Sequence, residues 1–187
     1  MIERTLVLIK PDGVARGLIG ECVKRFEQRG LKVVGMKMIR PDAKLVGDHY
    51  TDDLEWLTSV GRKTKVSYEK KGMKMDKPDV EIGRYVRKWL MDYLASGPVV
   101  ALVLEGHHAV EIARKLCGDT EPRVALPGTI RGDLSVESYM IGDEKQRPVK
   151  NVVHASGSVK EAESEMKVWF SENELCSYER VDWAAIH

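Results

Sequence analysis

The run VVALVL at positions 99–104 constrains the fold more than any other segment of this chain. Six consecutive apolar residues leave no polar face, so a strand formed here is buried on both faces. A Ser-Gly-Pro turn precedes it at positions 96–98. We therefore predict that residues 99–104 form a central strand of a sheet.

Shorter apolar runs predict the rest of the sheet. Strands are expected at 4–10, ended by Pro-Asp-Gly, at 31–39, and at 150–156. Helical spacing favours helices over 17–30, 42–50, 81–96, 108–118 and 158–170, the last with a capping box from Ser158 to Glu161. Residues 56–80 read as an inserted or loosely helical excursion, and 119–134 and 135–148 as irregular loops. The order predicts an α+β fold of the ferredoxin-like, split-βαβ type, with an antiparallel four-stranded sheet.

Composition narrows the class of protein. A chain of 187 residues suits one domain, and 30 basic against 29 acidic residues give a net charge of +1. Bulk charge therefore indicates neither a nucleic-acid nor a membrane partner, and any anion site must be local. Three widely spaced cysteines and the lack of a long apolar segment favour a cytoplasmic protein without a membrane span.

Several known site motifs are excluded. The stretch GLKVVGMK begins like a phosphate loop, but Met36 stands where the loop needs lysine and a strand follows instead of a helix. GxGxxG, HExxH and CxxC are absent from the sequence. What remains is a set of polar and cationic residues at strand ends and in loops: Lys10, Arg114, Thr120, Arg131, Asn151 and His154. Each alone is an ordinary surface group, but together they suit a chain of phosphates.

Phosphoryl transfer needs cations around the moving group and a metal that bridges phosphate oxygens. Because no acidic cluster such as DxD is present, we expect Mg²⁺ to be held mainly by the nucleotide's own phosphates and not by protein side chains. His154 is the candidate nucleophile, and Ala155, Ser156 and Gly157 leave room for a phosphate. The alternative is a structural histidine at a strand end. A nucleophilic imidazole also needs a partner on its second nitrogen, and periodicity does not choose between Glu163 and Glu165.

The sequence resembles the nucleoside diphosphate kinase family over most of its length. The resemblance rests on LVLIKPDGVARGLIGE, the pair His49-Tyr50, SGPVVALVLEG, ARKLCGDTEP, PGTIRGD and NVVHASGS followed by EAESEMKVWF. It implies one domain over 1–187, with insertions near 56–84 and 135–148 like those of the longer, archaeal-type members. It also implies ping-pong transfer of the γ-phosphate of ATP to nucleoside diphosphates through a phosphohistidine, with Mg²⁺.

The resemblance assigns a role to each site residue. His154 matches the phosphorylated histidine, Glu165 its carboxylate partner, and Ser156 a neighbour of the nucleophile. The positions that contact phosphate and ribose are Lys10, Tyr50, Arg114, Thr120, Arg131 and Asn151. Counting back from Ser96 makes Val86 and Leu90 the base-facing positions. A homo-oligomer, with a hexamer favoured, is also implied.

Two residues depart from the family pattern. Val86 stands where an aromatic ring usually stacks on the base, and base stacking contributes about 1–3 kcal/mol. Gly157 stands where the family usually carries Asp, at the start of the helix after His154; a Gly there costs a few tenths of a kcal/mol in capping.

Two other functions compete with nucleoside diphosphate kinase activity as interpretations of the sequence. An RNA-binding ferredoxin-like module needs aromatic residues on its central strands, and Phe and Trp are absent from those strands. A catalytically silent nucleotide-binding relative, with a regulatory or assembly role, would be expected to lose His154 or the cations, all of which are present.

Overall fold

The computed structural model describes residues 1–69, 72 and 74–186. The chain divides into two compact units. Unit 1 comprises Met1–Arg40 and Gly97–His187, and unit 2 comprises Pro41–Ser96. The prediction of one domain with two insertions remains a prediction.

Unit 1 is built on a four-stranded antiparallel sheet. Its strands are β1 (Ile2–Ile9), β2 (Lys32–Ile39), β3 (Val99–His107) and β4 (Val153–Ala155), in the order β2-β3-β1-β4. The apolar run at 99–104 lies in β3, which pairs with β2 on one side and β1 on the other. The predicted fold class and the central place of this strand are confirmed.

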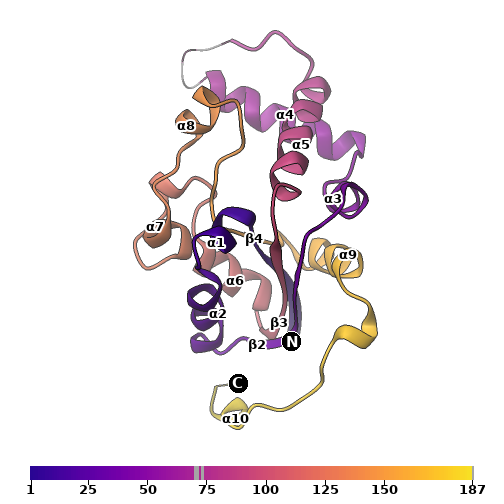
Figure 1. Ribbon diagram of the computed structural model, residues 1–187, viewed down its shortest axis with the longest axis vertical. Coiled ribbons are helices and arrows are strands. Elements are labelled where there is room, and N and C mark those ends of the chain that lie inside the picture. Colours follow the sequence, from indigo (N-terminus) through magenta and orange to yellow (C-terminus); the bar gives the residue numbers. More distant parts are fainter. Residues whose placement is uncertain (70–71, 73, 187) are drawn as a thin grey trace. The chain divides into compact units, whose positions relative to one another are not determined.

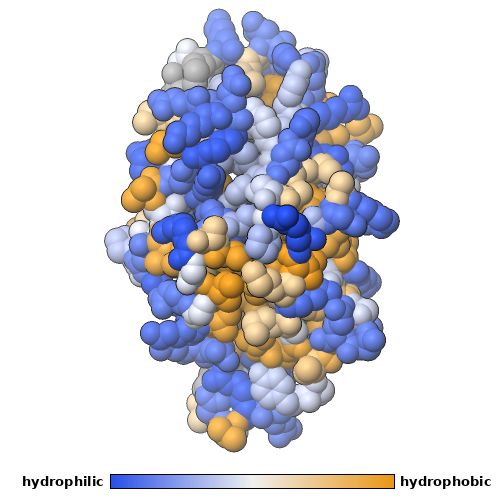
Figure 2. Space-filling model, viewed as in Figure 1, coloured by the Kyte–Doolittle hydropathy of each residue, from blue (hydrophilic) through white to orange (hydrophobic). Residues whose placement is uncertain are grey.

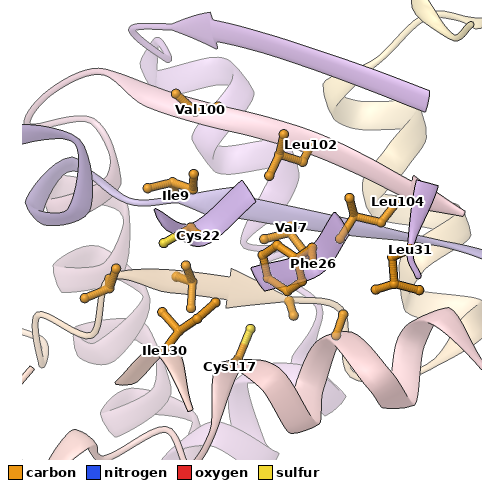
Figure 3. Close-up of a cluster of buried hydrophobic side chains, with 14 of the residues drawn as sticks. Val7, Ile9, Cys22, Phe26, Leu31, Val100, Leu102, Leu104, Cys117 and Ile130 are labelled. Atoms are coloured by element: carbon orange, nitrogen blue, oxygen red, sulfur yellow. The ribbon is translucent and has the colours of Figure 1, made fainter. Parts of the chain in front are cut away.

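Helices cover both faces of this sheet. Figure 1 shows α2 (Ile19–Gln28) and α6 (Ala109–Cys117) on one face and α9 (Val159–Trp169) on the other. The main core lies under α2 and α6, where alternate residues of the strands, such as Val7, Ile9 and Leu102, meet Phe26 of α2 and Cys117 of α6 (Figure 3). The opposite residues of β1, Leu6 and Leu8, are also fully buried, so the central strands are covered on both sides.

The structure corrects the loop predictions. Pro11–Ala15, taken as a turn, forms the short helix α1, with Pro11 at its first position. The segment 119–134 contains the 3₁₀ turn η1 (Pro122–Val124) and helix α7 (Ile130–Leu134), and 135–148 contains helix α8 (Tyr139–Glu144). Thr129 and Ser138 cap α7 and α8 through their hydroxyls. Helices of five or six residues have too few turns to show a periodic apolar stripe.

The end of the chain runs along β2. After η2 (Glu172–Glu174), the N–H of Cys176 donates to the carbonyl of Val34 at 2.7 Å, and the hydroxyl of Tyr178 donates to that of Val33 at 3.0 Å. Trp183 begins α10 (Trp183–Ile186), and its ring lies 5.0 Å from Nζ of Lys32. This segment therefore covers the first half of an edge strand.

Unit 2 is helical and consists of α3 (Ala43–His49), α4 (Leu54–Glu69) and α5 (Asp79–Leu94). The expectation of a loosely helical excursion over 56–80 was wrong for its first part, because α4 is a regular helix of 16 residues. Helices α4 and α5 pack backbone to backbone: a Cβ on Gly61 would collide with the carbonyl of Asp79, and one on Gly83 with that of Leu57. The two helices thus depend on glycine at their crossing.

Among the described residues, no helix combines the length and the apolar character that a bilayer crossing requires. Hydrophilic side chains cover much of the face seen in Figure 2, as expected for a chain with 32% charged residues.

Candidate active site

Strand β1 positions both ends of the predicted site in unit 1. Lys10 follows β1 directly, and Leu8 lies opposite His154 in the register between β1 and β4. The N–H of Lys10 donates to the carbonyl of Val152 at 2.8 Å. Lys10 and His154, 144 positions apart in the numbering, are therefore fixed to one strand end.

His154 is oriented by a carboxylate. Its Nε2 lies 2.9 Å from Oε1 and 3.1 Å from Oε2 of Glu165, which is on α9. The hydroxyl of Ser156 donates to Oε2 of the same carboxylate at 2.6 Å. The His154 side chain is 19% exposed and that of Glu165 only 9%. Glu165, and not Glu163, is thus the carboxylate that meets His154, and Nε2 is the nitrogen that it binds.

Lys10 is a buried cation, 7% exposed. Its Nζ donates to Oδ1 of Asn151 at 2.7 Å, and Nδ2 of Asn151 donates to the carbonyl of Thr120 at 2.8 Å. Burial, and then the positive charge of Arg131, lower the pKa of Lys10 to about 7. Asn151 therefore links Lys10 to the loop after α6.

Arg131 is buried in α7 and binds backbone carbonyls. Nε donates to the carbonyl of Asn151 at 3.2 Å, Nη1 to that of Gly118 at 2.7 Å and Nη2 to that of Val153 at 2.8 Å. A guanidinium has five donors, so one N–H on each terminal nitrogen remains for a ligand. Burial lowers the pKa of Arg131 and raises that of the neighbouring Cys117 thiol to about 11, which keeps this thiol neutral.

The side chain of Arg114, unlike that of Arg131, is not fixed by hydrogen bonds to other described residues. Arg114 is an exposed residue of α6, and its side chain makes no hydrogen bond or ion pair within the part of the chain that is described. It lines a surface pocket of about 510 Å³ with Gly118, Asp119 and Thr129. This guanidinium can meet a ligand with all of its donors.

Helix α9, which follows His154, is preceded by Gly157, at the position where the family resemblance predicts Asp. Ser158 accepts a hydrogen bond from the N–H of Glu161 at 3.2 Å, as the predicted capping box requires. The Glu161 carboxylate, however, accepts from the N–H of Gly157 at 2.8 Å, one residue before the predicted partner. A Cβ at Gly157 would meet this carboxylate and lie 3.6 Å from Nη1 of Arg114. Glu161 therefore occupies the space that a side chain at 157 would take.

The other predicted nucleotide contacts lie in unit 2. Tyr50 follows α3, is 8% exposed, and contacts the rings of His49 and Trp56. Arg87 of α5 donates to the Tyr50 carbonyl at 2.7 Å. Val86 and Leu90 are half-buried and lie one turn apart on α5, so they share a face of that helix.

Sequence reasoning missed Asp12. Its Oδ2 accepts a hydrogen bond from the N–H of Val152 at 3.1 Å, across 140 positions of the chain. The only local signal was its place in the Pro-Asp-Gly segment after Lys10, which resembles a turn.

The donors of unit 1 at this site are mostly cationic. Among its described residues, no three Asp, Glu, His or Cys side chains bring ligand atoms together in the way that a protein-bound metal requires. Glu165 is already occupied by His154 and Ser156. Mostly cationic donors of this kind suit the binding of an anion. A metal cation would then be bound through that anion and not directly by these side chains.

An α+β sheet that presents a carboxylate-oriented histidine beside buried lysine and arginine defines a phosphate-binding protein with a potential histidine nucleophile. Comparisons with known proteins agree with this class. The family model described as "Nucleoside diphosphate kinase" matches residues 3–56 and 81–175. The chain therefore belongs to the nucleoside diphosphate kinase family and is an enzyme of that class.

Individual relatives match nearly the whole chain. The nucleoside diphosphate kinase of Pyrobaculum aerophilum is 46% identical, with 93% of this chain and 98% of the relative covered. The crystal structure of an NDP kinase from the same organism has a TM-score of 0.91 at 43% identity, covering 95% and 100% of the two chains. A transition-state mimic of the Borrelia burgdorferi kinase, with bound vanadate and ADP, has a TM-score of 0.81 at 37% identity and covers 98% and 96%.

The family match also bears on the inserted segments. Residues 57–80 lie outside the matched ranges, whereas 135–148 lie within them.

Proposed function

We propose that this enzyme transfers the γ-phosphate of ATP to other nucleoside diphosphates by a ping-pong mechanism through a phosphohistidine at His154. The observation that carries the proposal is the contact between Nε2 of His154 and the Glu165 carboxylate at 2.9 Å. A proton held on Nε2 leaves the lone pair on Nδ1, which makes Nδ1 the attacking atom.

In the first half-reaction, Nδ1 attacks the γ-phosphorus of ATP. The Nδ1–P bond forms as the bond from phosphorus to the β,γ-bridging oxygen breaks, and ADP leaves with that electron pair. The imidazole becomes positively charged while its proton stays on Nε2. The Glu165 carboxylate stabilises this charge, and Ser156, which donates to the same carboxylate at 2.6 Å, holds it in place.

Three cations are suited to the phosphate chain. The Lys10 ammonium gives a compact charge, and Arg114 offers a bidentate fork that no other described side chain occupies. Arg131 contributes the donors that its backbone contacts leave over. Charge-assisted hydrogen bonds of this kind contribute about 1.5–3 kcal/mol each.

We expect Mg²⁺ to enter with the nucleotide. When bound with the nucleotide, it would supply positive charge that offsets the charge of the phosphates. The described donors of unit 1 are mostly cationic, and cationic side chains do not ligate a metal ion. This supports a metal held mainly by the phosphates of the nucleotide.

For the nucleoside, we propose the contacts that the family resemblance implies. Asn151 and Thr120 offer polar groups at the edge of the phosphate site, and Lys10 reaches Asn151 directly. Tyr50, Val86 and Leu90 are proposed contacts from unit 2. Because position 86 is valine and not an aromatic residue, we propose that the base is held by aliphatic contact. Aliphatic contact of this kind discriminates little between bases.

In the second half-reaction a nucleoside diphosphate takes the place of ADP. Its terminal β-phosphate oxygen attacks the phosphorus on His154, the P–N bond breaks, and Nδ1 regains its electron pair. GDP, CDP, UDP and their deoxy forms are the proposed acceptors. The ADP and vanadate bound to the Borrelia relative support this substrate class, as does the CDP bound to a Halobacterium salinarum relative with a TM-score of 0.72 and 34% identity.

Labelled ATP tests the proposal. Incubation with Mg²⁺ should give a protein label that is stable to alkali and labile to acid, and His154→Ala should abolish it. His108→Asn is the matched control, since it removes an exposed imidazole and Asn tolerates the φ of 53° at that position. An unlabelled wild type would overturn the mechanism and favour the silent relative. Equal labelling of His154→Ala would overturn the assignment of the nucleophile.

We also propose a cytoplasmic homo-oligomer, with a hexamer favoured. Support comes from β2, an edge strand on which Met36 is 59% and Met38 56% exposed. Apolar side chains on an open edge favour association with another chain. Light scattering gives the mass, and a monomer would contradict the proposal.

A further inference from the structure

The backbone just before His154 is strained. Val152 has a φ of 66°, which is unfavourable for a β-branched residue. The N–H of Val153 donates to the carbonyl of Asn151 at 2.7 Å and closes a three-residue turn around Val152. Turns of this γ type with positive φ are rare and strained. Such a conformation persists only where its surroundings hold it.

Three groups hold this turn. The Asp12 carboxylate accepts from the N–H of Val152 at 3.1 Å, and the backbone N–H of Lys10 donates to the carbonyl of Val152 at 2.8 Å. Arg131 donates to the carbonyls of Asn151 and Val153 on either side. The central residue of the turn is therefore fixed at both its N–H and its carbonyl by the segment that follows β1.

The position of α1 makes the contact from Asp12 possible. A Cβ on Gly13 would lie 2.9 Å from Cγ2 of Ile9 and 3.1 Å from both Cγ1 and the carbonyl oxygen of Val152. Glycine at this position lets α1 approach the turn closely enough for the carboxylate of the preceding residue to reach the Val152 N–H.

We propose that Asp12 is a positioning residue for phosphoryl transfer: its carboxylate holds the strained turn at Val152, and the turn sets where His154 presents its imidazole. The proposal rests on the proposed function of His154. Without the carboxylate, the Val152 N–H loses its acceptor and the turn relaxes toward negative φ. Because His154 is two residues away, its ring shifts relative to Glu165 and the phosphate-binding cations. Small misplacements of a reacting group lower the rate of the chemical step far more than they lower affinity.

A purely electrostatic role for Asp12 makes a different prediction. The charge of Asp12 raises the pKa of Lys10, against the larger effects of burial and Arg131. Removal of that charge would weaken nucleotide binding and move its pH dependence to lower pH. Asp12→Asn separates the two roles, since an amide oxygen still accepts from the Val152 N–H but carries no charge.

The test compares Asp12→Ala and Asp12→Asn with wild type in single-turnover phosphorylation by labelled ATP, with KM and the pH profile measured in parallel. We expect Asp12→Ala to lower the phosphorylation rate at saturating ATP by about tenfold or more. Both variants lose the charge that raises the pKa of Lys10, so any shift of KM or of the pH profile should be the same in the two. Asp12→Asn should keep at least about half of the wild-type rate, because its acceptor remains. A wild-type rate in Asp12→Ala overturns the proposal, as does an equal loss in both variants.

A pair of glycine variants tests the same turn without changing charge. Gly13→Ala pushes against Val152 and should lower the phosphorylation rate. Gly20→Ala is the matched control, because no atom lies within 4 Å of its Cβ position, and it should keep the wild-type rate. If Asp12→Ala does not fold, the comparison of the two glycine variants tests the proposal in its place. A rate for folded Gly13→Ala equal to that of Gly20→Ala would overturn the proposal.

The two proposals fail in different ways. If wild type takes up no label, the function proposed for His154 is wrong. If wild type is labelled and Asp12→Ala is labelled equally fast, only the role of Asp12 is wrong.

Discussion

The buried ammonium of Lys10 should make nucleotide binding depend on pH. Its pKa of about 7 arises first from burial and second from Arg131. Near pH 8 about nine-tenths of the unliganded protein therefore carries a neutral Lys10. A phosphate placed beside Nζ favours the charged form and raises this pKa again. Binding of ADP with Mg²⁺ at pH 8 should then take up close to one proton, about 0.9.

The loss of affinity can be estimated from two energies. Protonating a neutral Lys10 costs about 1.4 kcal/mol for each pH unit above its pKa. The charge-assisted bond that protonation provides contributes about 1.5–3 kcal/mol. Affinity should therefore fall about tenfold per pH unit above 7, and level off about one to two units higher, where the neutral amine binds as well.

Calorimetry measures this proton directly. Titrations with ADP and Mg²⁺ at pH 8, in two buffers of different ionisation enthalpy, give the number of protons taken up. Lys10→Arg is the control: arginine stays charged throughout this range, so the variant reports only the titration of the nucleotide itself. Equal proton uptake in wild type and Lys10→Arg would refute the reasoning.

Four further predictions concern other residues of the site. Glu165→Gln should lower turnover about 5- to 30-fold, the effect of losing about 1–2 kcal/mol when a charged acceptor becomes neutral, with nucleotide affinity kept; an unchanged turnover number would contradict this. Arg114→Ala should weaken ADP binding about tenfold at an unchanged melting temperature, whereas Arg131→Ala should weaken ATP binding and turnover and also lower the melting temperature. A wild-type melting temperature or dissociation constant for Arg131→Ala would count against its double role. Glu161→Ala should lower the free energy of unfolding by about 1 kcal/mol, since the N–H of Gly157 loses its acceptor; unchanged thermal unfolding would exclude that contact as stabilising.

Sequence patterns predicted the parts of the fold that depend on long apolar runs. The run at 99–104 has no polar face, and this alone required a central strand. The Lys10 and His154 segments were predicted to form strand ends because each joins a short apolar run to small or turn-forming residues. The family resemblance then predicted Glu165 over Glu163, and the structure has Glu165 on His154.

Contacts between residues far apart in the sequence could not be predicted in this way. The bond from Val152 to Asp12 joins positions 140 apart and leaves no periodic trace. The φ of 66° at Val152 is likewise invisible, since valine is the residue least expected to adopt it. Helix α8 was missed because six residues do not complete a second turn.

The two arginines of the site show why residue type alone does not give a role. Sequence reasoning treated Arg114 and Arg131 alike, as cations for a phosphate chain. Arg131 donates to three backbone carbonyls, two of which flank the strained turn, so it holds the backbone beside the proposed nucleophile while it keeps donors for a ligand. The Arg114 side chain makes no such backbone contacts among the described residues, so it can follow the phosphate as the proposed reaction proceeds. The fixed and the adjustable cation thus suit different needs of the proposed transfer through His154: one would keep the imidazole in place, and the other would adapt as the phosphorus moves.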